Sequence, residues 1–355
     1  MGLRSFIARR IVYSLILIIV VIIVDFFLFI LMPGNPAAML MSAWSRESPG
    51  ARQKEEYELN ALWGLNDPLY LQLLKYIRNL LTWNFGIAIV GREPISLLMA
   101  QKIPYTLLLL GTATILSMLI GLAWGMMVIR RRGSSFDTGS VVASLIMGSL
   151  PTFWIGLVLL WVFAVSLRWL PGAQAFPVEW AGGNWPQAIV MSSSSSANSL
   201  SAIITVNATQ AWNLLWGYLS HLILPLTTLT LFDFGGWLLL TRATMLDAIT
   251  EDYVVTARAK GLSENSVLYR HALKNASLPI ITNAAMAFGF VLSGAIITET
   301  VFSYPGVGAW VFFSLDQRDY SVLMAFFYII SLAVIIANIV ADLLYGIIDP
   351  RIKYG

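Results

Sequence analysis

The chain has no cysteine, only two histidines and few charged residues. Its 355 residues include 22 Lys and Arg and 19 Asp and Glu, so that 12% are charged, which is about half the share in an average soluble domain. Without cysteine, disulfide scaffolds, thiolate metal sites and cysteine nucleophiles are excluded. So little charge leaves too few polar side chains to cover a water-soluble body of this size, and disorder would require the opposite balance.

Apolar residues are abundant and make up 58% of the chain. A helix needs about 20 mostly apolar residues to cross the hydrocarbon core of a membrane, and six stretches are long enough. Strands of a membrane barrel would be shorter and would alternate polar with apolar positions, which these stretches do not do. We therefore predict an all-α integral membrane protein with six transmembrane helices, at Ile11–Met32, Pro104–Ile129, Val141–Leu167, Tyr218–Thr241, Leu278–Phe302 and Val322–Ile348.

Basic residues are concentrated in alternate connections between these spans. They lie before the first span and after the second, fourth and sixth, whereas the short connections on the other side hold only Arg168 and Arg318. Short cytoplasmic loops retain Lys and Arg, so we predict a multi-pass protein of the cell membrane with both termini in the cytoplasm. The first apolar run exceeds the core of about 7–15 residues that a cleaved signal peptide has, so we expect a retained anchor.

The spans divide the chain into segments of different character. The second outer segment carries several tryptophans, which suit a membrane interface, and a serine run typical of a flexible insert. An acceptor sequon for glycosylation begins at Asn207. The expected segments are a cytoplasmic N-terminus with the first helix (1–32), an extracytoplasmic domain (33–103), helices two and three (104–167), an outer loop with an insert (168–217), helices four to six (218–348) with an inner loop (244–277), and a cytoplasmic tail (349–355).

The segment 244–277 connects two spans on the predicted cytoplasmic side and is helical in propensity. Gly261 is expected to end a first helix, and Ser263 to cap a second by accepting hydrogen bonds from its free N–H groups. Glu264 then lies in the first turn, where a negative charge suits the helix dipole. Ala257 and Gly261 are four residues apart and are expected on one face, where small side chains permit close approach. We predict that this loop seats in a groove on another protein.

A series of motifs follows in order along the chain. The inner loop reads Asp252-Tyr253 and Ala257-Arg258-Ala259-Lys260-Gly261-Leu262, then His271-Ala272-Leu273-Lys274-Asn275-Ala276. Other members are Pro33-Gly34-Asn35-Pro36, Gly64-Leu65-Asn66-Asp67-Pro68, Asn84-Phe85-Gly86, Arg132-Gly133-Ser134-Ser135-Phe136-Asp137, Thr298-Glu299-Thr300-Val301-Phe302-Ser303-Tyr304-Pro305-Gly306-Val307-Gly308 and Asp342-Leu343-Leu344-Tyr345-Gly346-Ile347-Ile348-Asp349-Pro350-Arg351. Over 1–171 and 217–355 the chain resembles the permeases of ATP-binding-cassette (ABC) importers, and in particular the first of the two permease subunits in the dipeptide and oligopeptide branch.

The resemblance implies a type I importer permease fold and a set of partners. These would be a second homologous permease, two ABC ATPase subunits and an extracytoplasmic substrate-binding protein, together with membrane lipid but no nucleic acid. The sequence has no Gly-x-x-x-x-Gly-Lys-Ser/Thr phosphate cradle. We therefore expect a transport subunit and not an enzyme, with no catalytic residue, metal or cofactor of its own, and with ATP and Mg²⁺ bound by the partner ATPases. By the same resemblance, the residues that couple to the ATPases would be Ala257, Arg258, Lys260, Gly261, Leu262, His271 and Asn275.

Two acids, Asp25 and Asp233, lie inside predicted spans, where the resemblance provides no counterpart. A charge at mid-bilayer costs at least about 2.5–3.5 kcal/mol, so such residues usually face a bundle interior or an aqueous path. We predict both as candidates for the substrate path. The alternative is a structural hydrogen bond to a neighbouring helix.

Several functions remain open on sequence alone. The leading one is a permease that forms half of the translocation path for di- or oligopeptides, and the same machinery could instead carry oligosaccharides. Two intramembrane acids would suit a cationic solute, whereas abundant tryptophan would suit sugar stacking. A self-sufficient proton-coupled transporter would leave the inner loop unexplained. An intramembrane enzyme would need a nucleophile with a base or a metal site, and nickel transport would need soft or imidazole ligands; the sequence offers neither.

Overall fold

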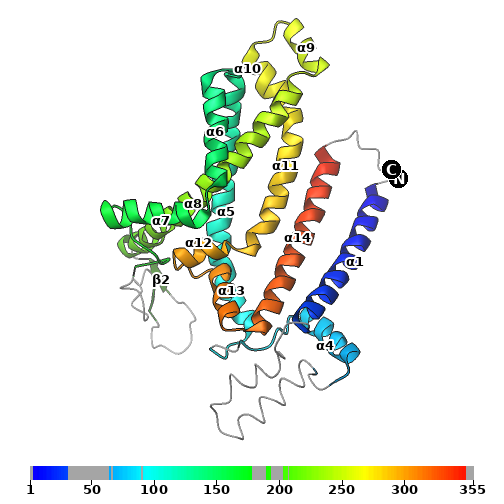
Figure 1. Cartoon of the computed structure of the whole chain (residues 1–355), viewed down its shortest axis with the longest axis vertical. Coiled ribbons are helices and arrows are strands. Elements are labelled where there is room, and N and C mark those ends of the chain that lie inside the picture. Colours follow the sequence, from blue (N-terminus) through cyan, green and yellow to red (C-terminus); the bar gives the residue numbers. More distant parts are fainter. Residues whose placement is uncertain are drawn as a thin grey trace.

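A computed structural model of the chain describes residues 3–30, 64, 67–88, 91–177, 189–192, 203–206 and 208–348. This part is almost entirely helical, as predicted, and its long helices run beside one another (Figure 1). The elements are α1 (Leu3–Ile30), α4 (Leu69–Leu81), α5 (Ile95–Arg130), α6 (Ser135–Ser149), α7 (Thr152–Leu159), the π-helix η1 (Leu160–Ser166), the antiparallel strands β1 (Ile189–Ser192) and β2 (Ile203–Val206), α8 (Ala208–Ala248), α9 (Asp252–Ala259), α10 (Glu264–Ser266), the π-helix η3 (Val267–Ala272), α11 (Leu273–Phe290), the 3₁₀ turn η4 (Val291–Ser293), α12 (Ile296–Val301), α13 (Val307–Asp316) and α14 (Tyr320–Ile348).

Five of the described helices are long and apolar enough to cross a membrane, and a bent pair makes six if it counts as one span. That pair corresponds to the predicted third span, Val141–Leu167, which is not one straight helix. Instead, α6 and the continuous helix α7–η1 meet at 96°. The break lies at Leu150, whose backbone is extended, because the proline that follows disfavours a helical conformation at the residue before it.

The predicted fifth span, Leu278–Phe302, also differs from the structure. Its helix begins earlier, at Glu264, and ends at Ser293. Gly294 then takes a φ of +72°, which only glycine adopts without strain, and α12 follows as a separate short helix. A side chain on Gly294 would lie 3.0 Å from the backbone of Gly308, so this glycine also allows the start of α13 to approach closely.

Several predicted features lie outside the described residues, and the structure therefore says nothing about them. They are the motif at 33–36, most of the insert at 177–216 with the sequon at Asn207, and the tail at 349–355.

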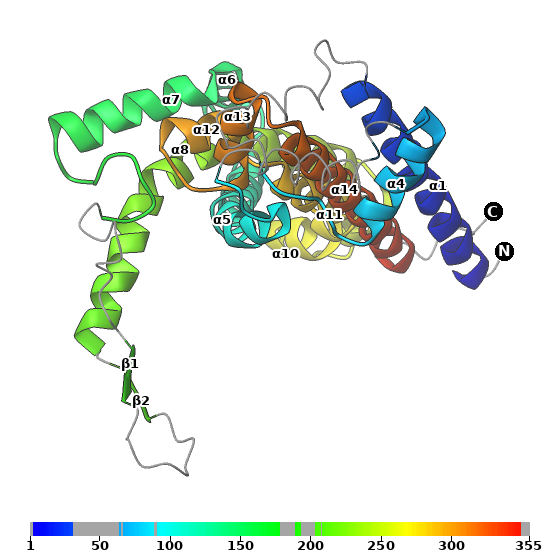
Figure 2. The ribbon, with the colours of Figure 1, turned by 90° about the horizontal axis from the view of Figure 1, so that it is seen from below.

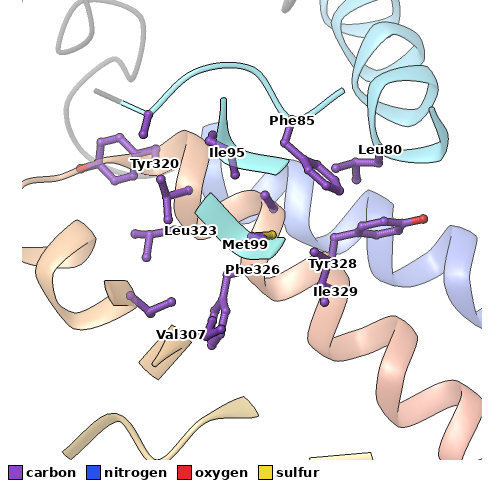
Figure 3. Close-up of a cluster of buried hydrophobic side chains, with 14 of the residues drawn as sticks. Leu80, Phe85, Ile95, Met99, Val307, Tyr320, Leu323, Phe326, Tyr328 and Ile329 are labelled. Atoms are coloured by element: carbon purple, nitrogen blue, oxygen red, sulfur yellow. The ribbon is translucent and has the colours of Figure 1, made fainter. Parts of the chain in front are cut away.

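The helices are held together by buried apolar clusters at both ends of the bundle. One cluster joins α1, α4, the loop before α5, the start of α5, α13 and α14. Figure 3 shows Phe85 of the loop beside Leu80 and Tyr328, and Val307 of α13 beside Phe326 of α14. At the opposite end, Met126 of α5, Met245 of α8, Val254 of α9 and Val267 of η3 form a second cluster. We call these the α4 end and the α9 end of the bundle. Seen from below, α7 and much of α8 extend away on one side, while α1 lies on the other (Figure 2).

Candidate functional site

The predicted inner loop forms a hairpin of helices at the α9 end of the bundle (Figure 1). The preceding helix, α8, continues to Ala248, beyond the expected loop start at 244, and α9 follows from Asp252 to Ala259. Gly261 then takes a φ of +75°, so the predicted end of the first helix at this glycine is confirmed. The second helix starts at Glu264 and passes through the π-helix η3 into α11.

Two details of the predicted loop are wrong. Ala257 is buried in the cluster at the α9 end, whereas Gly261 is exposed beyond the end of α9. These residues therefore do not share a helix face, because the helical period that would align them stops at Ala259. Ser263 occupies the cap position of α10, but its side chain makes no capping hydrogen bond. The first turn of α10 is exposed, so its N–H groups are open to water.

An ion pair closes the hairpin. Arg258 of α9 donates to Glu264 of α10 from Nη2 at 2.7 Å and from Nε at 3.2 Å. Glu264 lies in the first turn, as predicted. The hydrogen bonds from Arg258 raise the pKa of its guanidinium above an already high value, so this group stays charged at physiological pH.

Apolar side chains on this hairpin are exposed even though the rest of its outer surface is polar. Val255, with 58% of its surface exposed, lies on α9, Leu262 on the turn and Tyr269 on η3. Among the other predicted coupling residues, Lys260 and Asn275 are exposed and His271 is half-buried. The hairpin thus combines a buried inner face, which is fixed to α5 and α8, with an outer face that presents both apolar groups and charge.

A second ion pair fixes the first inner connection to α8 near the same end. Arg242 donates from Nε to Asp137 Oδ1 at 2.7 Å and from Nη2 to Oδ2 at 3.1 Å. The Gly133 N–H donates to the same carboxylate at 2.9 Å, and Asp137 is buried. This pair was not predicted, since its members are 105 residues apart and a single sequence does not show which charges meet.

The two predicted path acids have very different surroundings. Asp25 is only 8% exposed, and its Oδ2 has no hydrogen-bond partner within the described ranges. It lies beside Ile22 and Phe26, which belong to the apolar cluster at the α4 end. Asp233, in contrast, is exposed on α8. The role of each in a substrate path remains a prediction.

Asp233 is held from one side only. Ser117 of α5 donates to its Oδ2 at 2.9 Å, and the Trp237 indole donates to the same oxygen at 3.2 Å. Asp233 lies nine residues before Arg242 on α8, which corresponds to about 14 Å along the helix. This distance places the carboxylate well inside the hydrocarbon depth if Arg242 marks the membrane boundary.

A buried glutamate that our sequence analysis did not single out joins three elements near the α4 end. Glu299 of α12 is 0% exposed. Its Oε1 accepts from Thr106 Oγ1 of α5 at 3.0 Å, and its Oε2 accepts from the N–H of Ala309 at 2.9 Å. Thr106 in turn accepts from the N–H of Val307 at 2.8 Å. The glutamate and the threonine together cap the start of α13. The sequence signal that could have identified this residue is a glutamate inside an apolar stretch.

In the described ranges, no group of three or more His, Asp or Glu residues is placed so that it could hold a metal ion. Of the two histidines, His221 is buried and lies 2.7 Å from the carbonyl of Gly217 through Nδ1.

Comparisons with known proteins agree on one family. Residues 114–354 match the family described as the binding-protein-dependent transport system inner membrane component, and residues 3–109 match the N-terminal model of such membrane components. The chain is 34% identical to the oligopeptide transport system permease protein AppB of Bacillus subtilis and 35% identical to the di/tripeptide transport system permease protein DppB of Pseudomonas aeruginosa, with 99% of each chain covered. It is 33% identical to the glutathione transport system permease protein GsiC of Salmonella paratyphi A, with 92% of each chain covered.

Proposed function

Because the chain belongs to the family of inner membrane components of binding-protein-dependent transport systems, we propose that it forms half of the path through which an ATP-driven importer carries di- or oligopeptides. It is a multi-pass permease subunit and not an enzyme. The observation that carries the proposal is the match over nearly the full chain to permeases named for oligopeptides and di/tripeptides. These names favour peptides over oligosaccharides as the cargo.

The proposed assembly contains a second homologous permease, two ABC ATPase subunits and an extracytoplasmic substrate-binding protein. The family description itself names dependence on a binding protein. In this proposal ATP and Mg²⁺ bind to the ATPases, both termini of the chain are cytoplasmic, and the α9 end of the bundle faces the cytoplasm. The basic residues near that end, among them Arg130, Arg131 and Arg242, support this orientation.

Within this assembly, the hairpin of α9, α10 and η3 is the proposed docking site for an ATPase. Apolar side chains such as Val255, Leu262 and Tyr269, exposed on a polar element that projects from the bundle, are typical of a protein contact surface. The buried face of the hairpin packs on α5 and α8. A displacement of the hairpin by the ATPases would therefore move these spans with it as one body, in the way that packed elements move in switching transitions.

Reconstitution tests the function directly. We expect the full transporter in liposomes, supplied with its binding protein, to take up labelled trialanine only when ATP is present on the ATPase side. The permease reconstituted alone with a proton gradient should take up none. Proton-driven uptake without ATPases would instead favour the self-sufficient transporter.

Placing a charge on the exposed apolar residues of the hairpin should uncouple transport. We expect Val255→Asp and Leu262→Asp each to lower ATP-driven uptake at least about tenfold, since burying an unpaired carboxylate in a contact costs more than the roughly 1.4 kcal/mol that this factor represents. Val255→Thr, which keeps the shape of the side chain, is the matched control and should retain most uptake. Co-purification of the ATPases reports docking. Undiminished co-purification and uptake with both aspartate variants would rule out this face as the docking site.

Exchanging the two residues of the ion pair in the hairpin would distinguish two roles for Arg258, closing the hairpin and contacting the ATPase. If Arg258 acts by closing the hairpin, the double variant Arg258→Glu with Glu264→Arg should retain ATPase docking, while Arg258→Glu alone should weaken it. Since both side chains are substantially exposed, we expect either single change to alter the stability of the permease by less than about 1 kcal/mol. Loss of docking in the exchanged pair as well would show that Arg258 contacts the ATPase itself.

A further inference from the structure

Asp233 is an acidic residue on an exposed face of α8, about 14 Å along the helix from Arg242. One of its carboxylate oxygens, Oδ2, accepts from both Ser117 and Trp237. The other, Oδ1, has no hydrogen-bond partner in the part of the chain that the structure describes. Within the same part, the observed ion pairs join basic side chains to acids other than Asp233. The carboxylate is therefore fixed in place, with one oxygen and its charge open to a ligand.

The surroundings of Asp233 show which side of α8 is open. Phe234 and Trp237 are buried against neighbouring helices, and Trp124 of α5 lies 5.8 Å from the Phe234 ring. Phe232, Asp233 and Gly236 are exposed. A side chain on Gly236 would meet nothing within 4 Å. Apart from the hydrogen bond from Ser117 to Asp233, this strip of α8 is exposed in the described part of the chain, with open space at Gly236.

Lipid is a poor neighbour for that strip. A carboxylate at the bilayer centre is costly, and intramembrane acids accordingly face a bundle interior or a water-filled cavity. If Asp233 served only to hold α5 and α8 together, the hydrogen bonds from Ser117 and Trp237 would be sufficient. Burial of both carboxylate oxygens would stabilise such a contact further. No basic side chain among the described residues forms an ion pair with Asp233, so its exposed oxygen suits a site that binds a cation only transiently.

We propose that Asp233 is a transient binding site for a primary ammonium group in the water-filled path, and that it binds the N-terminal ammonium of a peptide during transport. This inference rests on the proposed function, since it takes the strip on α8 as the wall of the path. An ammonium group has three N–H donors and can bind the free Oδ1 while Oδ2 stays held by the protein. Such a charge-assisted bond is stronger than one between neutral groups. A neutral sugar would gain much less from the same carboxylate.

The lack of cysteine in the chain allows a test that does not depend on transport. Gly236→Cys places a single thiol one helical turn from Asp233, where there is room for a side chain. In the assembled transporter, we expect a cationic methanethiosulfonate reagent to modify this cysteine at least about tenfold faster than an anionic one, because a fixed anion concentrates cations near it. The same transporter without the introduced cysteine gives the background.

Removing the charge should abolish that preference. Asp233→Asn keeps an oxygen that can accept from Ser117 and Trp237 but is neutral, so the two reagents should then react at similar rates. Asp247→Asn, an exposed acid 14 residues further along α8, should leave the preference unchanged. If neither reagent reaches the cysteine, the strip is covered by the partner permease and the proposal is wrong. It is equally wrong if the preference survives Asp233→Asn.

Transport then identifies the group that is bound. Wild-type transporter should take up labelled trialanine at least about tenfold faster than N-acetyl-trialanine at low concentration, and Asp233→Asn should reduce that ratio toward one. N-acetyl-Ala-Lys-Ala carries its ammonium on a side chain. Its uptake shows whether Asp233 binds any primary ammonium group or only the N-terminal one. Delivery by the binding protein is the same for both forms of the permease, so it cancels in the comparison. Failure of wild type to import any peptide would contradict the proposed function, whereas import with an unchanged ratio in Asp233→Asn would contradict this inference only.

Discussion

Replacing Arg242 with alanine is expected to destabilise the folded permease by about 2–4 kcal/mol. The change leaves the Asp137 carboxylate buried without its bidentate partner, and breaking a buried pair from one side costs about 3–5 kcal/mol. The Arg242 side chain is 30% exposed, so water can partly replace it, and we therefore expect a loss about 1 kcal/mol smaller than that range. Thermal unfolding of the purified protein in detergent measures the loss.

The companion variants make this expectation specific to the pair. Asp137→Ala leaves Arg242 able to reach water and should cost less than Arg242→Ala. The double variant should cost clearly less than the sum of the two single changes, because groups in contact are not additive. Lys260→Ala removes an exposed basic residue at the same end of the bundle and should change stability by less than about 0.5 kcal/mol. Equal losses of stability for Arg242→Ala and Lys260→Ala would show that the ion pair of Arg242 and Asp137 does not stabilise the fold.

The six spans and their order could be predicted because hydrocarbon thickness sets the length of an apolar helix, and the structure has six if the bent pair of α6 and α7–η1 counts as one. The shapes of two spans could not, since apolar composition continues without interruption through Pro151 and past Gly294. At Pro151 the local restriction on the preceding residue decides the break. At Gly294 a positive φ and the close approach of Gly308 decide it. Both causes are conformational, and hydropathy does not report them.

The candidate site, too, could be predicted only where a local property of the sequence determines the structure. Gly261 identified the turn of the hairpin, because ending a helix with a positive φ is a local property of glycine. Asp25 and Asp233 looked equivalent in sequence, yet one is buried and the other exposed, because facing depends on how whole helices pack. The pairing of Thr106 with Glu299 spans 193 residues, and a single sequence has no signal for such a contact.

Removing the Glu299 carboxylate is expected to destabilise the α4 end of the bundle by about 2–4 kcal/mol. In Glu299→Ala, the Thr106 hydroxyl and the Ala309 N–H lose their acceptor inside the protein, and each unsatisfied buried group costs about 1–3 kcal/mol. Relief from burying a carboxylate offsets part of that loss. Glu299→Gln keeps the shape and one acceptor oxygen, so we expect a smaller cost of about 1–2 kcal/mol. Thermal unfolding in detergent is again the measurement, and an unchanged midpoint for Glu299→Ala would contradict the role of this residue.

A glycine at the same junction provides an independent test of the same cap. Gly306 precedes α13 with a φ of −78° and a ψ of −179°, which alanine adopts without strain. A Cβ there would nevertheless collide with the Glu299 carboxylate and with Thr106 Oγ1. Gly306→Ala should therefore lower stability by an amount similar to Glu299→Ala, through the collision alone. Gly111→Ala in α5 adds the same methyl group where nothing lies within 4 Å, and it should be neutral or slightly stabilising because alanine favours a helix. If the two alanine variants behaved alike, the tight contact between Gly306 and Glu299 would not contribute to stability. If they differ as expected, α5, α12 and α13 are joined through one carboxylate.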